Sequence, residues 1–593
     1  MCGISGYIGN TMAAPIVLKS LSKLEYRGYD SAGIASVSDN KFNVCKSVGK
    51  LHNLISKSNS GADCVGNVAI GHTRWATHGA ANIKNAHPHL SDRFAIVHNG
   101  IIKNSDSLRK KYLSDAQLCS DTDSEVIVQL INLFTNNGET VVSSLCRVMS
   151  LCEGSWAIAL LDRFDSNKIY VSRNKSPIII GEGDDFKMIA SDIIALSPKI
   201  KSVYEINDME IAEITTDAIK FYDISGNILK HTPKPARISD QEDYTKDNYP
   251  HFMLKEIEEQ PDVIKRIINY YKTDDYFNIP PQFVSSTKTC DRIYIIACGT
   301  SYHAGLTGKT FFEKITHKPV CVCIASEFIY NPPIFSPNPV FIFVSQSGET
   351  ADCIAAMDFV KRKGYTVYSV TNVVESTLAL MLDYNFHLFA GREISVASTK
   401  AYTAQLAVFA ILAYAAVVDI SVFYYLGCIA DNMSVLFDQK NHFRQIAHDY
   451  LKNASNCFYI GRGTDLYTCM EASLKLKEIS YIHSEAIAAG ELKHGSIALI
   501  ESGTPVFAIN TQKSLFYHTK SNAREAQARG ANVITLTTSS DIPQSIIIPR
   551  IDNEIFLPFL SIIPTQYIAY YAALQNGCDV DMPRNLAKSV TVE

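Results

Sequence analysis

The chain has no marked excess of either charge. It carries 55 Lys and Arg against 60 Asp and Glu, which gives a formal net charge of −5. A chain of this balance has no strongly basic surface to offer a polyanion. Nucleic acid is therefore not an expected partner.

Cysteine is frequent, but it occurs in no pattern typical of disulfides or metals. The 15 cysteines are scattered, no CxxC pair occurs, and no secretory leader is recognised. Cys321 and Cys323 share one strand face without a nearby His. We therefore expect a reducing, cytoplasmic location with most thiols buried as small hydrophobes, and neither a metal nor a cofactor.

No apolar run is long enough to span a bilayer. The longest candidate, Leu406 to Val418, contains thirteen apolar residues and is followed by Asp419. A spanning helix needs about 20. A buried helix pair in a large α/β core is the expected structure, and a membrane is not an expected partner.

At 593 residues the chain is too long for one hydrophobic core. Three or four domains of about 150 residues are expected. Of the residues, 47% are hydrophobic and 19% are charged, which is ordinary for globular domains.

The first residues, Met1-Cys2-Gly3-Ile4-Ser5-Gly6, can form a nucleophile. If Met1 is removed, the thiol and the α-amine of Cys2 are attached to one carbon. Their ordinary pKa values are about 8.5 and about 8, so the amine can accept the thiol proton. The alternative is that a Cys at position 2 is incidental, and these letters alone favour that alternative.

Polar segments lie directly beside three predicted strands. A polar-aromatic loop over 26–33 precedes the strand 34–37, residues 72–79 follow the strand 68–71, and residues 98–100 follow the strand 94–97. Loops held at strand ends commonly carry sites. We expect these three segments to be loops that surround Cys2.

Each loop offers chemistry that a Cys amidohydrolase needs. The Asn99 amide and the Gly100 N–H can donate to an oxyanion. Arg74 can bind the carboxylate of an amino-acid substrate and Asp123 its ammonium. The alternatives are a surface ion pair for Arg74 and a helix cap for Asp123.

Taken together and in order, these motifs resemble those of the N-terminal-nucleophile glutamine amidotransferases, an α+β fold. The resemblance covers residues 1–235. It implies that Cys2 attacks the glutamine amide with Asn99 and Gly100 as oxyanion donors. It also implies a set of glutamine-binding residues: Arg74, Trp75, Thr77, His78 and Asp123. Trp75 would gate an internal ammonia passage.

The rest of the chain is predicted to contain a duplicated α/β unit. Residues 236–250 are predicted to be a linker, an amphipathic helix that Pro261 stops follows it, and from Asp291 apolar strands alternate with Gly/Ser loops and helices. Thr300 and Thr464, Val344 and Ile509, and Val367 and Val533 occupy matching places 164 to 166 positions apart. A steady offset of that size indicates two copies of one domain, which we place at 251–430 and 431–578.

The segment Ser345-Gln346-Ser347-Gly348-Glu349-Thr350 lies between a buried strand and a helix in the first copy. Hydroxyls and N–H groups at a helix start bind phosphate, and Thr300 and Ser301 follow the preceding strand. The Lys and the spaced glycines of nucleotide loops are missing, so a sugar phosphate fits better. The alternative is an ordinary Ser-rich helix cap.

In the second copy, Lys475 and Glu478 share one face of a predicted helix. An exposed salt bridge is the usual interpretation of such a pair. Neighbouring leucines make partial burial reasonable, and a partly buried Glu can serve as a general base. His494 lies on a Gly-flanked loop, and the tail 579–593 is expected to dock on the core.

These motifs resemble the two sugar isomerase (SIS) domains of the glutamine–fructose-6-phosphate aminotransferase family, doubly wound α/β folds. The resemblance implies that Glu478 moves the proton between C1 and C2, beside Lys475. It further implies that His494 assists ring opening in the neighbouring subunit of a homodimer, and that Lys588 forms a Schiff base. The sugar-phosphate residues it implies are Thr300, Ser301, Ser345, Gln346, Ser347, Thr350, Val396, Ser398 and Ala587.

Two other functions compete with this one. A phosphoribosyl amidotransferase would need a pyrophosphate-binding acidic strand end, which the sequence lacks. A sugar-phosphate sensor with an inactive front domain would be expected to lose Cys2, Glu478 or Lys588, and all three are present.

Overall fold

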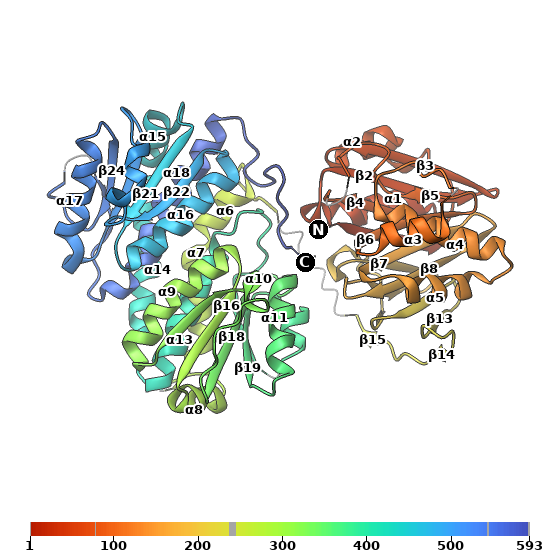
Figure 1. Ribbon diagram of the computed structural model, residues 1–593, viewed down its shortest axis with the longest axis horizontal. Coiled ribbons are helices and arrows are strands. Elements are labelled where there is room, and N and C mark those ends of the chain that lie inside the picture. The colour runs from red at the N-terminus through yellow and green to blue at the C-terminus, as the bar shows by residue number, and fades with distance from the viewer. Residues whose placement is uncertain are drawn as a thin grey trace. The chain divides into compact units, whose positions relative to one another are not determined.

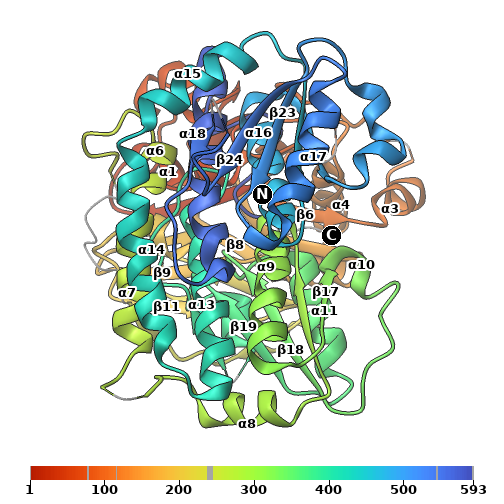
Figure 2. The same ribbon diagram turned by 90° about the vertical axis from the view of Figure 1, so that its left-hand side faces the viewer.

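The computed structural model describes residues 2–76, 79–114, 116–236, 245–274, 276–382, 384–542 and 545–590. They fall into two compact units, one within Met1–Tyr244 and Ala587–Val592 and the other within Thr245–Leu586. The colour scale of Figure 1 follows the chain through both units, and Figure 2 gives a second view of the elements.

Two antiparallel sheets form the described part of the first unit. The eight-stranded sheet has the order β15 (Lys234–Pro235), β11 (Ser202–Glu205), β9 (Ile179–Glu182), β10 (Phe186–Ala190), β1 (Gly3–Gly9), β4 (Val68–Arg74), β2 (Ser31–Ser38), β3 (Lys41–Val48). The seven-stranded sheet has the order β14 (Ile228–Leu229), β13 (Ile219–Tyr222), β12 (Glu210–Ile214), β8 (Asp165–Asn174), β7 (Gly154–Asp162), β6 (Phe94–Ile102), β5 (His89–Leu90).

Helices cover the outer faces of the two sheets. Ile4 and Ile70 of one sheet meet Val97 and Ala159 of the other in a shared core. The first sheet is covered by α1 (Ala13–Ser22) and α2 (Leu51–Lys57). The second is covered by α3 (Ser105–Tyr112), α4 (Asp123–Asn136) and α5 (Val141–Leu151). The result is a four-layer sandwich.

Parts of all three expected loops are strands instead, and residues 31–33 of the first belong to β2. His72, Thr73 and Arg74 belong to β4, and residues 98–100 belong to β6. Pairing continues through both, with His72 opposite Gly33 and Asn99 opposite Ala157. The prediction was wrong because polar letters suggested solvent, whereas these side chains are buried and bonded to one another.

The second unit contains two parallel sheets with one topology. In the described residues each sheet has five strands in the spatial order second, first, third, fourth, fifth. The first sheet is β17 (Val320–Ile324), β16 (Arg292–Ala297), β18 (Pro339–Ser345), β19 (Val367–Thr371), β20 (Asn385–His387). The second is β22 (His483–Ala488), β21 (Asn456–Gly461), β23 (Pro505–Asn510), β24 (Asn532–Thr537), β25 (Ile546–Ile547). This identity of order is what a duplication produces.

Helices lie on both faces of each sheet, as Figure 1 shows for α9 and α13 on one face of the first sheet and α10 and α11 on the other. The helices of the unit are α6 (Phe252–Glu258), α7 (Gln260–Tyr271), α8 (Pro281–Thr289), α9 (Gly299–Thr316), α10 (Ala325–Phe328), α11 (Ala351–Lys361), α12 (Thr377–Leu380), α13 (Lys400–Val417), α14 (Ser421–Phe437), α15 (Lys440–Leu451), α16 (Thr464–Ser480), α17 (Phe516–Gln527) and α18 (Leu557–Gln575). Pro261, expected to stop a helix, lies in the first turn of α7, where its missing N–H costs nothing.

The order of strands in the first parallel sheet indicates where a ligand would bind. All five strands are parallel, but the chain adds β17 on one side of β16 and β18 on the other, and ligands bind at the carboxyl ends of strands at such a switch point. Thr300 and Ser301 follow β16, and the segment 345–350 joins β18 to α11.

Among the described residues, two helices are long and apolar enough to cross a membrane, Lys400–Val417 and Glu554–Gln575, but 94% of each apolar window is buried within the protein. They are core helices of the second unit, as expected for the apolar run at 406–418. The tail also docks as expected over its first residues. Val580 is fully buried, and the Asp581 carboxylate accepts the N–H groups of Phe252 and Met253.

Candidate functional sites

Cys2 lies immediately before β1, half-buried beside Trp75. The N–H of Trp75 donates to the Cys2 sulfur at 3.3 Å, and the thiol lies 3.5 Å from the Trp75 carbonyl oxygen. Burial raises the pKa of the Cys2 thiol, while the Trp75 N–H and Arg74 oppose that rise. A buried thiol of this kind needs a base to become a nucleophile.

The amide of Asn99 is held against Cys2 by three neighbours. Its Nδ2 donates to the Cys2 carbonyl oxygen at 3.1 Å and to Ser191 Oγ at 2.9 Å. Its Oδ1 lies 3.0 Å from His72 Nε2, which also lies 3.0 Å from the carbonyl oxygen of His98. Both partners of Nε2 are acceptors, so this nitrogen carries the proton and fixes the orientation of the amide.

His72 and Ser191 were not singled out from the sequence. Burial lowers the pKa of His72 to about 3, so the imidazole is neutral at ordinary pH. Ser191 lies 92 positions from Asn99. His72 lies in the polar segment 72–79, which was the available signal, but nothing local could have identified Ser191.

Gly100 has a positive φ of 134°. A Cβ at this position would lie 2.1 Å from the Ser155 carbonyl oxygen of the paired strand. The glycine is therefore needed for close packing of β6 on β7, in addition to any approach by substrate.

Arg74 and Asp123 are both buried. The guanidinium of Arg74, 3% exposed, donates to the carbonyl oxygens of Gly79 and Ala80 at 3.0 and 3.2 Å. Asp123 accepts the Ile102 N–H at 2.8 Å, and Thr122 occupies the N-cap of α4. The surface-pair and helix-cap alternatives were therefore wrong. Thr77 and His78 lie outside the described residues.

The segment 345–350 folds into a tight turn in the second unit. Ser345 Oγ lies 2.8 Å from Thr350 Oγ1 and accepts the Gly348 N–H at 3.0 Å. Thr350 is the N-cap of α11 but makes no side-chain capping bond. The hydroxyls of Ser345 and Ser347 accept N–H groups within the turn, those of Gly348 and Glu349, and the phosphate role stays a prediction. Gln346 and Ser347 are half-buried beside them.

A buried charge cluster joins α16 to the start of α9. Lys475 Nζ lies 2.6 Å from Glu478 Oε2, 3.4 Å from Glu471 Oε1 and 3.0 Å from Thr300 Oγ1. Glu471, fully buried, also accepts from Thr300 at 3.0 Å and lies 2.8 Å from His303 Nδ1.

The side chain of Lys475 is 1% exposed and that of Glu478 is 20% exposed, so the exposed-pair alternative was wrong. Burial opposes the charge of Lys475, but Glu471 and Glu478 raise its pKa above the ordinary value. Lys475 is thus a fixed cation beside a half-buried carboxylate that can move a proton. Glu471 and His303 were not expected from the sequence.

The other residues predicted to act on the sugar have contacts outside this charge cluster. Ser301 Oγ accepts from Gln405, Ser398 donates to Glu393, and Val396 is buried beside the docked tail. His494 is exposed on a short 3-10 helix, Leu492–His494. Ala587 and Lys588 fall in the first compact unit. Their roles stay predictions.

The two units thus offer a thiol beside fixed amide donors, and a hydroxyl-rich turn beside a lysine–carboxylate pair. Over the described ranges, no group of three or more His, Cys, Asp or Glu could hold a metal ion.

Known proteins match the chain along its whole length. The family model of a glutamine amidotransferase domain matches residues 55–248, and that of a SIS domain matches 288–415 and 450–575. Proteins named glutamine–fructose-6-phosphate aminotransferase (isomerizing) from Oceanobacillus iheyensis and Bacillus subtilis are 48% and 47% identical, each over 100% of both chains.

A solved structure, the C-terminal domain of glucosamine-fructose-6-phosphate aminotransferase from Francisella tularensis, matches at 34% identity and a TM-score of 0.55. It covers 57% of this chain and 99% of that one. The expected glutaminase domain and the two SIS domains are thereby confirmed as fold class.

Proposed function

The chain belongs to the glutamine–fructose-6-phosphate aminotransferase (isomerizing) family, and we propose from this membership that its two sites together make glucosamine 6-phosphate. Glutamine and water give glutamate and ammonia at Cys2. Ammonia and fructose 6-phosphate then give glucosamine 6-phosphate and water in the second unit. The full-length identity carries this proposal, because both sets of reacting side chains lie within the matched length.

In the first step, the free α-amine of Cys2 accepts the thiol proton after Met1 is removed. The thiolate attacks the glutamine amide, and the Asn99 Nδ2 and the Gly100 N–H receive the oxyanion. Arg74 and Asp123, with Trp75, Thr77 and His78, hold the amino-acid end. Ammonia leaves, and water releases glutamate from the thioester.

In the second step, the hydroxyls of Thr300, Ser301, Ser345, Ser347 and Thr350 hold the sugar phosphate. Gln346, Val396, Ser398 and Ala587 complete the predicted pocket. His494 assists ring opening, and Lys588 forms a Schiff base with the ketone, which releases water. Ammonia adds to this imine and expels the Lys588 amine, which leaves the imine of the sugar at C2. Glu478 then moves a proton between C1 and C2, and Lys475 stabilises the charge that develops on the adjacent oxygen.

Ammonia would be protonated and lost in water, so we propose an internal passage gated by Trp75. We further propose a cytoplasmic homodimer in which the exposed His494 serves the partner's site. The amino sugar formed would be the first intermediate of the UDP-N-acetylglucosamine pathway.

The reaction is tested with glutamine labelled with ¹⁵N at the side-chain amide. Incubation with fructose 6-phosphate should give glucosamine 6-phosphate that carries the label, detected by mass spectrometry. Glutamate without any amino sugar would favour another acceptor, and absence of both products from a folded protein would favour a sensor.

A further inference from the structure

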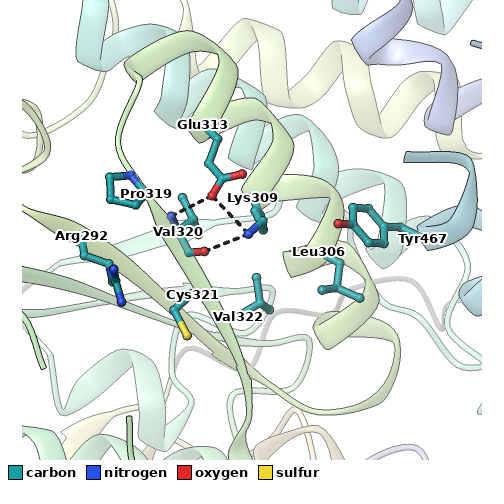
Figure 3. A pocket seen from close by; sticks show the side chains of 9 residues that line it. All are labelled: Arg292, Leu306, Lys309, Glu313, Pro319, Val320, Cys321, Val322 and Tyr467. Atoms are coloured by element: carbon teal, nitrogen blue, oxygen red, sulfur yellow. Dashed lines mark hydrogen bonds and ion pairs between the residues drawn. The ribbon is translucent and has the colours of Figure 1, made fainter. Parts of the chain in front are cut away.

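A pocket of about 490 Å³ opens beside the edge strand β17. Figure 3 shows the side chains that line it, among them Arg292, Lys309, Glu313 and Cys321. Lys309 donates to the Val320 carbonyl oxygen at 3.2 Å, and Glu313 accepts the Val320 N–H at 3.1 Å. The start of β17 is therefore fixed, and none of these residues is assigned to either reaction.

A pair of thiols lies on this strand. Cys321 and Cys323 are two positions apart and share one face, with their sulfurs separated by 3.6 Å. Both residues are half-buried rather than enclosed. Cys321 is one of the residues that line the pocket, and the Cys323 thiol is already in van der Waals contact with its sulfur.

The charges around the pair favour a reactive thiolate. The hydrogen bond from Cys323 lowers the pKa of Cys321 to about 6, and Arg292 and Lys309 act in the same direction against burial. The same interaction raises the pKa of Cys323. A low-pKa thiol beside a neutral resolving thiol is the usual arrangement of redox-sensitive cysteines.

The strand geometry makes a disulfide possible but strained. Residues two apart in a strand are separated by about 6.6 Å between Cα atoms, near the upper limit of about 6.8 Å for disulfides. Bridging the sulfurs requires β17 to bend at Val322. In the described sheet β17 pairs with β16 alone, so the bend disturbs one ladder. Strained disulfides are reduced readily.

We propose that Cys321 and Cys323 form a reversible dithiol–disulfide modification site for small disulfides that carry carboxylates. The Cys321 thiolate attacks one sulfur of the reagent, forms a mixed disulfide and expels the other half as a thiolate. Cys323 passes its proton to that thiolate and attacks Cys321, which releases the second half. Two protein thiols are oxidised while one small disulfide becomes two thiols. Arg292 attracts the carboxylates, whereas Lys309 is already ion-paired with Glu313 at 3.2 Å.

The modification should affect the sugar site, an effect that rests on the proposed function. Cys323 pairs with Ile296 and Ile324 with Ala297. Thr300 follows Ala297 by three residues on the same segment. A bend in β17 therefore moves the end of β16 and raises the KM for fructose 6-phosphate.

The chemistry is tested on the reduced full-length protein with oxidised glutathione, which is anionic, and with bis(2-hydroxyethyl) disulfide, which is neutral. Free thiols are alkylated, and a chymotryptic digest separates residues 321–323 from Cys353 for mass spectrometry. The expected product is this peptide lacking two hydrogens, restored by dithiothreitol. A persistent adduct on wild-type Cys321, or two unmodified thiols, would overturn the proposal.

The rates provide matched controls. At pH 7 the gain in thiolate outweighs its lower nucleophilicity, so Cys321 should react about twofold faster than a thiol of ordinary pKa. The exposed Cys119 is the internal comparison. Arg292→Gln should slow the anionic reagent but not the neutral one. Cys323→Ser should trap the mixed disulfide on Cys321, and modification of Cys323 in Cys321→Ser would contradict the assigned order.

Enzyme assays separate the coupling from the chemistry. Oxidation should raise the KM for fructose 6-phosphate several-fold in the wild type and leave the Cys321→Ser, Cys323→Ser double variant unchanged. An unchanged KM with the disulfide in place would refute the coupling. If the protein makes no amino sugar, the mass measurement still decides the thiol chemistry.

Discussion

The ammonium of Lys475 lies 2.6 Å from the Glu478 carboxylate, one turn further along α16. The same ammonium donates to Thr300 at 3.0 Å. One buried cation therefore connects the residue we assign to proton transfer with the strand end we assign to the sugar. A change of charge on Lys475 or on Glu478 therefore changes the electrostatic environment of the other side chain.

Replacing Glu478 with Gln should abolish isomerisation and spare glutamine hydrolysis. An amide keeps the size of the side chain but cannot accept the proton, so glucosamine 6-phosphate formation should fall about 10²- to 10⁴-fold. Glutamate release without sugar measures the first site. Glu485→Gln, at an exposed position on β22, is the control and should be fully active. Normal isomerisation by Glu478→Gln would eliminate this residue as the base.

Replacing Lys475 with Met should destabilise the second unit, because Glu471 would be left as an uncompensated buried carboxylate. The expected loss is about 3–5 kcal/mol. Since the pKa of Lys475 is raised in the folded state, its contribution is fully present below the unfolded value of about 10.4 and is lost only as pH rises through the folded one.

The free energy of unfolding that Lys475→Met loses should thus be the same at pH 7 and pH 9. Urea unfolding followed by circular dichroism measures it. Lys477→Met, at an exposed position of the same helix, should cost little. Equal stability of the two variants would show that the cluster is not a buried ion network.

Replacing Gly100 with Ala should damage both the fold and the glutaminase. The added Cβ would lie 2.1 Å from a backbone oxygen, which cannot move without breaking the β6–β7 ladder. Gly138→Ala is the matched control, because φ is also positive (97°) but nothing lies within 4 Å of the new Cβ. Gly138→Ala should cost about 1 kcal/mol and Gly100→Ala clearly more. Similar unfolding midpoints would show that the contact relaxes.

Mild acid should weaken the first unit. Burial lowers the pKa of His72 to about 3 and those of His87 and His89 well below the ordinary value. The unfolded chain therefore binds protons below about pH 6.5 that the folded one does not, and stability falls as pH decreases. From pH 7 to 5.5 the expected loss is about 1 kcal/mol for each such histidine.

Both tryptophans, Trp75 and Trp156, lie in the first unit, so their fluorescence during urea unfolding reports on it. The ring nitrogens of His87 have no hydrogen-bond partner in the part of the chain that the structure describes. In His87→Phe, the free energy of unfolding lost between pH 7 and pH 5.5 should therefore be smaller by about 1 kcal/mol. His52→Phe, on the exposed face of α2, should leave it unchanged. An identical pH dependence in His87→Phe would refute the linkage.

Replacing Cys2 with Ala should end glutamine hydrolysis and leave the isomerisation of the sugar phosphate. The reason is that the thiol and the sugar residues belong to separate chemical steps. Cys119→Ala, at an exposed cysteine, controls for loss of a thiol. Loss of both activities in a folded Cys2→Ala variant would contradict the two-site scheme.

The repeated unit and the strand ends that carry Thr300 and the 345–350 turn were predictable from sequence, because strand–loop–helix patterns are local. The limits of β4 and β6 were not, since the polar letters of His72 and Asn99 imitate a loop until their buried partners are known. Pro261 was taken for a helix stop because Pro breaks a helix interior, but Pro also fits the first turn of a helix, and α7 begins there.

The order of residues alone determined where a nucleophile with its own amine could arise, at Cys2, and that two similar α/β domains follow. Tertiary structure alone decided that Ser191 and His72 orient Asn99, and that Glu471 holds Lys475 beside Thr300. These partners lie up to 175 positions apart in the chain. Burial and charge compensation arise only when such distant segments pack together.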